Sequence, residues 1–308
     1  MGTAHVSAGP APAPGGLVRR KPVDVVPYVF IAPAVVVVAL VFAYPVLSVL
    51  WSSFSVPALF GETEIGLDNY TSVLSDPLFH RALLNNVRLF LAVPVMTVLS
   101  VVIAALLFER VRGWQFYRSI VFVPYVIAIP VVGIVFSYVL QRNGLLNELL
   151  LALHLDPLVH DWLGSSGLAI WSVWLVIVWQ QVGFGVVLFL ARLSSLDATL
   201  LEAAMLDRAG WWQRFRNVTL PHLATTIEFF VTLSLINMLS WVFNYVYVMT
   251  GGGPVQSTYV LELLVFNSAF RDGQPSIASA LSVLVLLLAV VLLSVQALVR
   301  RRVERMEG

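Results

Sequence analysis

Six long stretches of the sequence contain no charged residue, and they constrain the fold more than any other feature. An α-helix needs about 20 apolar residues to cross the roughly 30 Å hydrocarbon layer of a membrane. We therefore predict an all-α polytopic membrane protein with six transmembrane helices. The stretches that would supply these helices are Val25–Trp51, Leu89–Phe108, Ser119–Gln141, Trp162–Ala191, Phe229–Met249 and Gly273–Val299.

The composition supports a membrane protein and argues against several other classes. Of the 308 residues, 59% are hydrophobic and only 11% are charged. A typical soluble domain is about 45–50% hydrophobic and about 25% charged. The chain has no cysteine, which excludes disulfides and thiolate metal sites. Its net charge of +1 gives no reason to expect a nucleic-acid partner.

The distribution of Lys and Arg predicts the orientation, because cytoplasmic segments of membrane proteins carry an excess of both. If the N-terminus is cytoplasmic, both tails and the loops Glu109–Arg118 and Arg192–Glu228 lie inside, and they hold most of the basic residues. The three outer loops hold only Arg81, Arg142 and Arg271, with Arg88 near a membrane boundary. Both termini are thus predicted to be cytoplasmic. The outer loops are Ser52–Arg88, Arg142–Asp161 and Thr250–Asp272.

The chain is predicted to contain one membrane domain between two tails. Residues 1–24 are rich in Ala, Pro and Gly and are expected to form a disordered cytoplasmic tail. Residues 25–300 are expected to form the transmembrane domain, which includes a long cytoplasmic loop at residues 192–222. Residues 301–308 form the second cytoplasmic tail.

The 192–222 loop has a helical pattern of its own. Asp197 is a good N-cap for a short helix, and Thr199 with Glu202 could instead form a capping box. Gly210 is expected to end this helix. A short isolated helix is marginally stable, so the helix needs a partner surface; the alternative is a surface helix that only joins two spans.

This loop resembles the EAA loop of permeases from bacterial carbohydrate-uptake ABC importers. One departure is Arg208, which stands where that family usually has glycine; Gly210 is expected to supply the turn instead. The residues that carry the resemblance are Glu202, Ala203, Ala204, Asp207, Ala209, Trp212, Gln213, Phe215, Thr219, Leu220 and Pro221.

The resemblance extends over about residues 25–300. Gly66–Tyr70, Tyr247–Pro254 with Thr258, and Ala278–Ala280 are similar to further segments of sugar permeases. The resemblance implies the type I importer permease architecture, a binding-protein-dependent transport system of the inner membrane, and a docking helix from Glu202 through Gly210. It also implies a second homologous permease, two cytoplasmic ATP-binding subunits that hold ATP and Mg²⁺, and an extracytoplasmic sugar-binding protein.

The chain itself shows no means of using ATP. A P-loop requires a G-x-x-x-x-G-K-[ST] motif, and the only lysine is Lys21, in an Arg-Arg-Lys-Pro context. No cofactor and no catalytic residue is expected. His154, Asp156, His160 and Asp161 could suggest a metal site, but their placement in one outer segment favours a solvated, partly helical loop.

Polar residues inside the predicted spans are candidates for the substrate path, because they are costly in a membrane and tend to face a cavity or another helix. Asn237, Trp241 and Asn244 share one helical face, and amides with an indole ring suit a sugar. The alternative is hydrogen bonding between helices. The candidates are Gln180, Gln181, Asn237, Trp241 and Asn244.

Three other functions stay open. A permease for glycerol-phosphate-type esters has the same overall plan. A secondary transporter would show ionisable residues within its spans and often two similar halves. A membrane enzyme would show a convergent cluster of acid, base or metal-binding groups. Neither of these last two patterns is evident in the sequence.

Overall fold

The structure is a computed structural model that describes residues 26–57, 63–109 and 113–307. The expected tail at residues 1–24 lies outside the described residues. The chain divides into two compact units, Met1–Leu47 and Ser48–Gly308, and each is taken by itself.

The first long apolar stretch forms one nearly continuous helix. It comprises α1 (Val26–Val38), a π-helical turn at Ala39–Ala43 and the beginning of α2 (Tyr44–Ser53). The π-helical turn ends two residues before Pro45. Because proline lacks an N–H and its ring crowds the preceding turn, a locally wider turn lets the helix continue past it. The segment Val29–Ser53 is long and apolar enough to cross a membrane.

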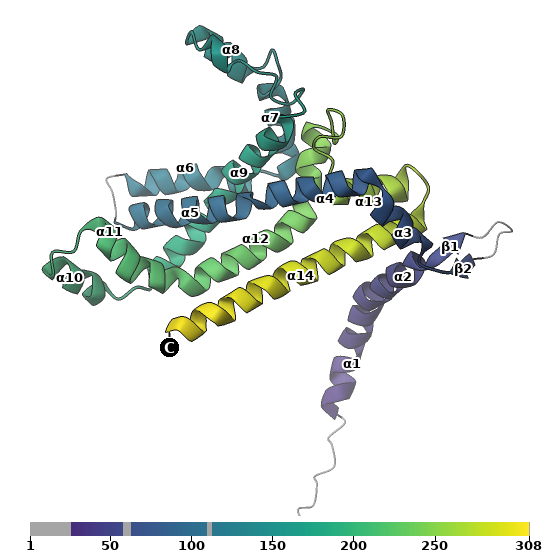
Figure 1. The fold of residues 1–308 in the computed structure, drawn as a ribbon. Helices are drawn as coiled ribbons and strands as arrows, with labels where there is room; N and C mark the ends of the chain where they lie inside the picture. Colours follow the sequence, from purple (N-terminus) through teal and green to yellow (C-terminus); the bar gives the residue numbers. More distant parts are fainter. Residues whose placement is uncertain (1–25, 58–62, 110–112, 308) are drawn as a thin grey trace, which may run out of the picture. The chain divides into compact units, whose positions relative to one another are not determined.

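The second unit is built almost wholly of helices (Figure 1). A short hairpin of β1 (Ser55–Pro57) and β2 (Thr63–Ile65) pairs Ser55 with Ile65 in antiparallel register. The helices that follow are α3 (Asp68–Ser75), α4 (Pro77–Phe90), α5 (Ala92–Phe108), α6 (Trp114–Val126), α7 (Ile129–Val139), α8 (Leu145–Ala152), α9 (Ala169–Leu193), α10 (Ala198–Leu206), α11 (Trp211–Arg214), α12 (Leu220–Met249), α13 (Leu261–Phe270) and α14 (Pro275–Glu307), with a 3-10 turn at Asp156–Leu158 and a π-helical turn at Phe215–Thr219.

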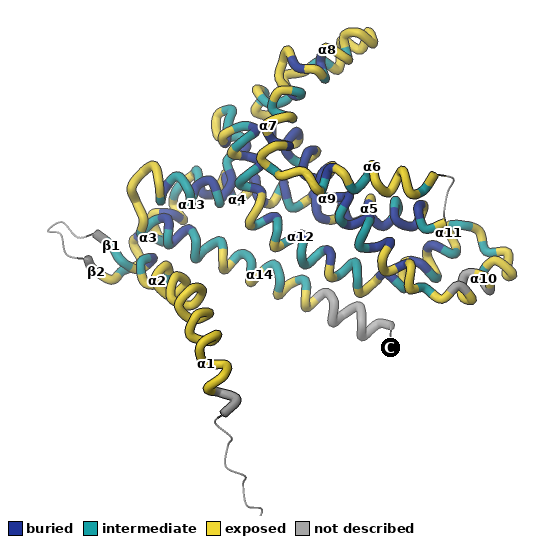
Figure 2. Tube along the Cα trace, turned by 180° about the vertical axis from the view of Figure 1, so that it is seen from behind, coloured by how far each residue is buried: buried dark blue, intermediate teal, exposed yellow. Residues whose placement is uncertain are grey.

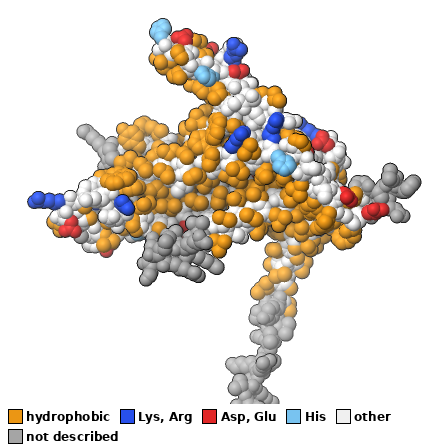
Figure 3. All heavy atoms as spheres, viewed as in Figure 1, with side chains coloured by type: hydrophobic (Ala, Val, Ile, Leu, Met, Phe, Trp, Pro, Cys, Tyr) orange, Lys and Arg blue, Asp and Glu red, His pale blue; other side chains and the backbone are white. Residues whose placement is uncertain are grey.

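Four segments of this unit are long and apolar enough to span a membrane, which with Val29–Ser53 makes five in the described part of the chain. They are Pro77–Phe108, Ala169–Leu193, Trp211–Met249 and Pro275–Leu298. Hydrophobic side chains cover the middle of the helices, and charged side chains gather towards the ends (Figure 3). This distribution is what a membrane-embedded surface requires.

The third apolar stretch differs from a simple span, because it is bent by 97° between α6 and α7. Ile127 and Ala128 are extended at the bend. Pro130 explains the break: in a continuous helix its ring would clash with the carbonyl of Val126. The exposed carbonyl of Ile127 accepts a hydrogen bond from the amide of Gln180 at 2.7 Å. Counted as one span, the bent pair brings the total to six.

The segment Thr250–Asp272, expected to be a loop, contains the apolar helix α13. Leu261, Leu263 and Leu264 of this helix are buried. Asn86 of α4 holds its first turn, since its amide oxygen accepts from the N–H of Leu261 at 2.9 Å and its amide nitrogen donates to Glu262 at 2.9 Å. Burial raises the pKa of Glu262 to about 7. The predicted outer segment therefore contains a helix of its own, whose 10 residues are too few to cross a membrane.

The centre of the unit is the close packing of α9 against α5 and α6. Ser100 of α5 donates a hydrogen bond to the carbonyl of Val182 at 3.0 Å, and Gly185 lies directly against Ser100. Gly183 faces the backbone of α6, where an added Cβ would lie 2.3 Å from the carbonyl oxygen of Val121. Small residues thus let these helices approach closely. Dark blue segments of α5 and α9 mark this core in Figure 2.

Candidate functional site

The 192–222 loop contains α10, and its N-terminus is formed as the sequence predicts. The carboxylate of Asp197 accepts a hydrogen bond from the backbone N–H of Thr199 at 2.9 Å, which is the N-cap contact. This bond also holds the pKa of Asp197 below its usual value. The alternative capping box is not used, because Thr199 already lies inside the helix.

The end of α10 differs from the expectation. Arg208, not Gly210, adopts the left-handed conformation, with φ of 56°. The N–H of Ala209 donates to the carbonyl of Ala204 at 3.0 Å, and the N–H of Arg208 donates to the carbonyl of Met205 at 3.0 Å. This pair of hydrogen bonds is the Schellman motif. Gly210 has φ of −65° and begins α11 instead. The prediction that Gly210 ends α10 was therefore wrong. The backbone turns at position 208, where the family usually has glycine and this chain has arginine.

Replacing Arg208 by glycine is expected to stabilise the end of α10. Glycine adopts the left-handed conformation freely, whereas for other residues it costs roughly 1–2 kcal/mol. Hydrogen exchange of the α10 amides should slow by about fivefold in Arg208→Gly. Gly210→Ala is the control and should leave exchange nearly unchanged, since an added Cβ there meets no atom within 4 Å. Faster exchange in Arg208→Gly would show that the arginine side chain itself holds the turn.

The surface of α10 is open. Glu202 and Asp207 are exposed, and so are the apolar side chains of Met205 and Leu206, the latter at 85%. Ala204 and Ala209 are half-buried, whereas the side chain of Ala203 lies outside the described residues. Figure 2 shows α10 largely in the colours of exposed and intermediate residues. Exposed apolar side chains beside carboxylates are typical of a surface that binds a partner.

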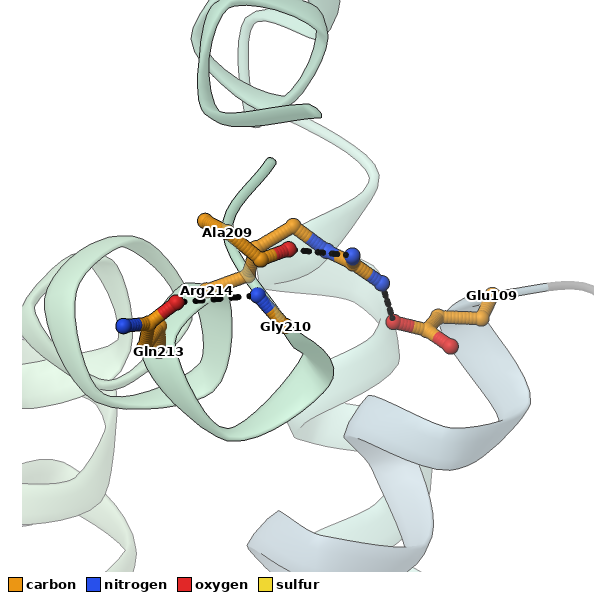
Figure 4. Close-up of polar contacts among 5 residues, drawn as sticks. All are labelled: Glu109, Ala209, Gly210, Gln213 and Arg214. Atoms are coloured by element: carbon orange, nitrogen blue, oxygen red, sulfur yellow. Dashed lines mark hydrogen bonds and ion pairs between the residues drawn. The ribbon is translucent and has the colours of Figure 1, made fainter. Parts of the chain in front are cut away.

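One side chain ties this loop to the end of α5 (Figure 4). Arg214 places Nη2 2.9 Å from a carboxylate oxygen of Glu109 and donates from Nη1 to the carbonyl of Ala209 at 3.0 Å. In the same turn, the side chain of Gln213 accepts from the N–H of Gly210 at 3.0 Å. The turn after α10 is therefore fixed both locally and across to a distant part of the chain.

A second candidate site is a cavity between α9 and α12. It brings together three of the five residues suggested for the substrate path, Gln181, Asn237 and Trp241, whereas Gln180 and Asn244 are not among its lining residues. The full lining is Met96, Ile177, Gln181, Phe184, Phe230, Ser234, Asn237, Met238, Trp241, Val242 and Tyr245.

Gln180 and Tyr245 form the wall behind this cavity. Both are almost completely buried, and the hydroxyl of Tyr245 donates to the amide oxygen of Gln180 at 2.7 Å. Gln181 in turn donates to that hydroxyl at 3.4 Å. The amide nitrogen of Gln180 donates to the carbonyl of Ile127. Both ends of the Gln180 amide therefore have partners within the protein. Sequence reasoning did not select Ser234 or Tyr245, although their spacing from Asn237 and Trp241 follows the helical repeat.

Comparison with known proteins identifies the family. Residues 70–305 match the family described as binding-protein-dependent transport system inner membrane component. A probable ABC transporter permease protein of Bacillus subtilis, YurN, is 36% identical over 277 residues, which cover 87% of this chain and 93% of that protein. The trehalose/maltose transport system permease protein MalF of Thermococcus litoralis is 33% identical over 267 residues, a match that covers 85% of this chain and 88% of MalF.

The fold is also shared with a solved structure. A chain in the crystal structure of a bacterial ABC transporter involved in the import of the acidic polysaccharide alginate superposes with a TM-score of 0.78 at 21% sequence identity. The superposition covers 90% of this chain and 95% of that one. The ABC-importer permease fold expected from the sequence is thereby confirmed. With the match over residues 70–305 and the similarity to YurN and MalF, the chain belongs to the family of binding-protein-dependent transport system inner membrane components.

Proposed function

We propose that this permease carries a sugar or sugar derivative and works as one of two homologous permease subunits. Two ATP-binding subunits, which hold ATP and Mg²⁺, would supply the energy, and an extracytoplasmic sugar-binding protein would deliver the substrate. The permease itself would be neither an enzyme nor a cofactor protein. The related MalF, named for trehalose and maltose transport, supports a sugar as the substrate class.

The observation that carries this proposal is the open surface of α10. The helix lies between two membrane-spanning segments, Ala169–Leu193 and Trp211–Met249, and its carboxylates and apolar side chains are exposed. A short helix of this kind gains stability when a partner covers it. The surface that would dock an ATP-binding subunit comprises Glu202, Ala203, Ala204, Asp207, Ala209 and Gly210.

In the membrane, the bent pair α6–α7 would count as one span, which gives six spans. Both termini and α10 would then face the cytoplasm, an orientation that the distribution of Lys and Arg favours. The family and the apolar helices support a multi-pass membrane protein. We place it in the plasma membrane of a bacterium.

The chemistry of the cavity between α9 and α12 favours a neutral sugar, although at about 20 Å³ it has room for only about one water in this conformation and would have to widen during transport. Its polar groups are the amides of Gln181 and Asn237, the indole of Trp241 and hydroxyls of Ser234 and Tyr245. Amides and hydroxyls can both donate to and accept from sugar hydroxyls, and an aromatic ring can cover the apolar face of a sugar. Its lining holds no Arg or Lys, the side chains that recognise phosphate. Glycerol-phosphate-type esters are therefore the second choice.

The same lining bears on a different class of transporter. Ion-coupled secondary transporters place ionisable side chains within their spans. None of the residues that line the cavity is Asp, Glu, Lys or Arg. This composition favours transport driven from outside the membrane, by a partner that hydrolyses ATP.

Uptake by the assembled importer in proteoliposomes tests the proposal. Transport should require ATP, the ATP-binding subunits and the binding protein, and a panel of labelled sugars and glycerol phosphate should identify a sugar. Asn237→Ala should reduce the initial rate at low sugar concentration by about fivefold, because one hydrogen bond to the substrate is lost, worth about 1 kcal/mol.

Asn244→Ala is the matched control, since Asn244 lies on the same helix but outside the cavity lining. It should transport at nearly the normal rate. Uptake by the lone chain without ATP would contradict the proposed function. Equal uptake by Asn237→Ala and the unaltered protein would remove Asn237 from the path.

A further inference from the structure

The polar contacts that hold α10 lie at its two ends and not along its length. Ala105, Phe108 and Glu109 at the end of α5 and Met205, Trp211 and Arg214 of the 192–222 loop enclose a cavity of about 410 Å³. Of the described α10 side chains only Met205 lines this cavity, and the others are exposed or half-buried, so packing holds the helix weakly. Its position is thus set by the few polar contacts at its ends.

The base of the loop is anchored separately. The Nε of Arg192 donates to the carbonyl of His222 at 3.3 Å, and the ring of His222 lies 3.1 Å from the carbonyl of Arg192. These contacts join the end of α9 to the beginning of α12. They lie at the two ends of the loop, so the contact that ties the α10 turn to α5 is made by Arg214.

Arg214 bridges the cavity edge. Its guanidinium bonds the carbonyl of Ala209, directly after the left-handed Arg208, and the carboxylate of Glu109, directly after α5. The side chain of Arg214 is only 18% exposed, whereas that of Glu109 is 42% exposed. The planar guanidinium can make both contacts at once, which an ammonium group cannot do with the same geometry.

Glu109 directly follows α5, and α5 is in contact with the helices that line the cavity. Helix α5 packs along α9, with the hydroxyl of Ser100 bonded to the carbonyl of Val182. The neighbouring Gln181 and Phe184 line the cavity between α9 and α12. Displacement of the α10 turn would therefore act on α5, and through α5 on the wall of the substrate cavity.

We propose that Arg214 is a positioning residue which, through Glu109, couples the movement of α10 to α5 and α9. The inference rests on the proposed function, in which an ATP-binding subunit moves α10. Ion pairs that are partly exposed contribute little to folding stability. Loss of this pair should therefore leave the fold intact and affect the transmission of movement.

The test uses the complete importer and measures sugar imported per ATP hydrolysed. Arg214→Gln and Glu109→Gln should each lower this ratio at least fivefold, while the ATP-binding subunits still co-purify with the permease. The double variant should be no worse than Arg214→Gln alone, because both substitutions break the same contact. Arg214→Lys should recover part of the ratio.

Arg216→Gln is the matched control, since Arg216 is an exposed arginine two residues further on. It should leave the ratio unchanged. A normal ratio in Arg214→Gln, or additive losses in the double variant, would overturn the inference while the proposed function stands. If the unaltered permease does not bind ATP-binding subunits at all, the proposed function fails, and the inference fails with it.

Discussion

Glu202→Lys is expected to abolish ATP-driven uptake and to prevent the ATP-binding subunits from co-purifying with the permease. Glu202 is exposed on α10, within the surface proposed to dock a partner. Reversing a charge in an interface places like charges together, which costs several kcal/mol. The permease itself should fold normally, because substitutions of exposed residues usually change stability by less than about 0.5 kcal/mol.

Glu148→Lys provides the control for this prediction. Glu148 is an exposed glutamate on another short helix, α8, so the substitution makes the same chemical change outside the docking surface. It should leave uptake and co-purification intact. Normal uptake and co-purification in Glu202→Lys would show that α10 does not dock through this carboxylate. Equal loss in both variants would indicate a general effect of charge reversal.

Gly183→Val is expected to destabilise the permease by about 3 kcal/mol, near the upper end of the usual cost of overpacking. In an unhindered helix, replacing glycine by alanine would instead stabilise by about 1 kcal/mol. Here the first added carbon would lie 2.3 Å from the carbonyl oxygen of Val121 and 3.2 Å from the Cα of Phe122. Because these atoms belong to the backbone, α6 would have to move away from α9.

The measurement is the melting temperature and the monodisperse fraction of purified protein in detergent. Gly167→Val is the control, since an added Cβ at Gly167 meets no atom within 4 Å. That variant should melt close to the unaltered protein. A melting temperature of Gly183→Val equal to that of the control would contradict the close approach of α6 and α9.

The long spans and the start of α10 could be predicted because each depends on local chemistry. A span needs only a sufficient apolar length, and the Asp197 cap needs only a carboxylate two residues before a free N–H. The extents were less accurate: the second span begins at Pro77 and not at Leu89. Helix α4 carries Arg81 and, in its last turn, Arg88, so a criterion based on charge-free length excluded it.

The remaining features depend on partners distant in the sequence. The bend at Ile127 is suggested by Pro130, but its stability depends on Gln180, 53 residues away. The α13 helix is fixed by Asn86, and the α10 turn by Glu109. Such long-range contacts leave no periodic signal in a single sequence. Arg208 is a different case: its hydrogen bonds are local, but its left-handed conformation contradicts the usual preference of an arginine.

The central claim, that α10 is the contact with the ATP-binding subunit, can be tested by cross-linking. The chain has no cysteine, so a single introduced cysteine reports one position. Leu206 on α10 and Val255, after the Gly251–Pro254 turn, are 85% and 82% exposed, which makes Leu206→Cys and Val255→Cys a matched pair. In the assembled importer, a thiol-directed cross-linker should join Leu206→Cys, and not Val255→Cys, to an ATP-binding subunit. A cross-link from Val255→Cys with none from Leu206→Cys would contradict the claim.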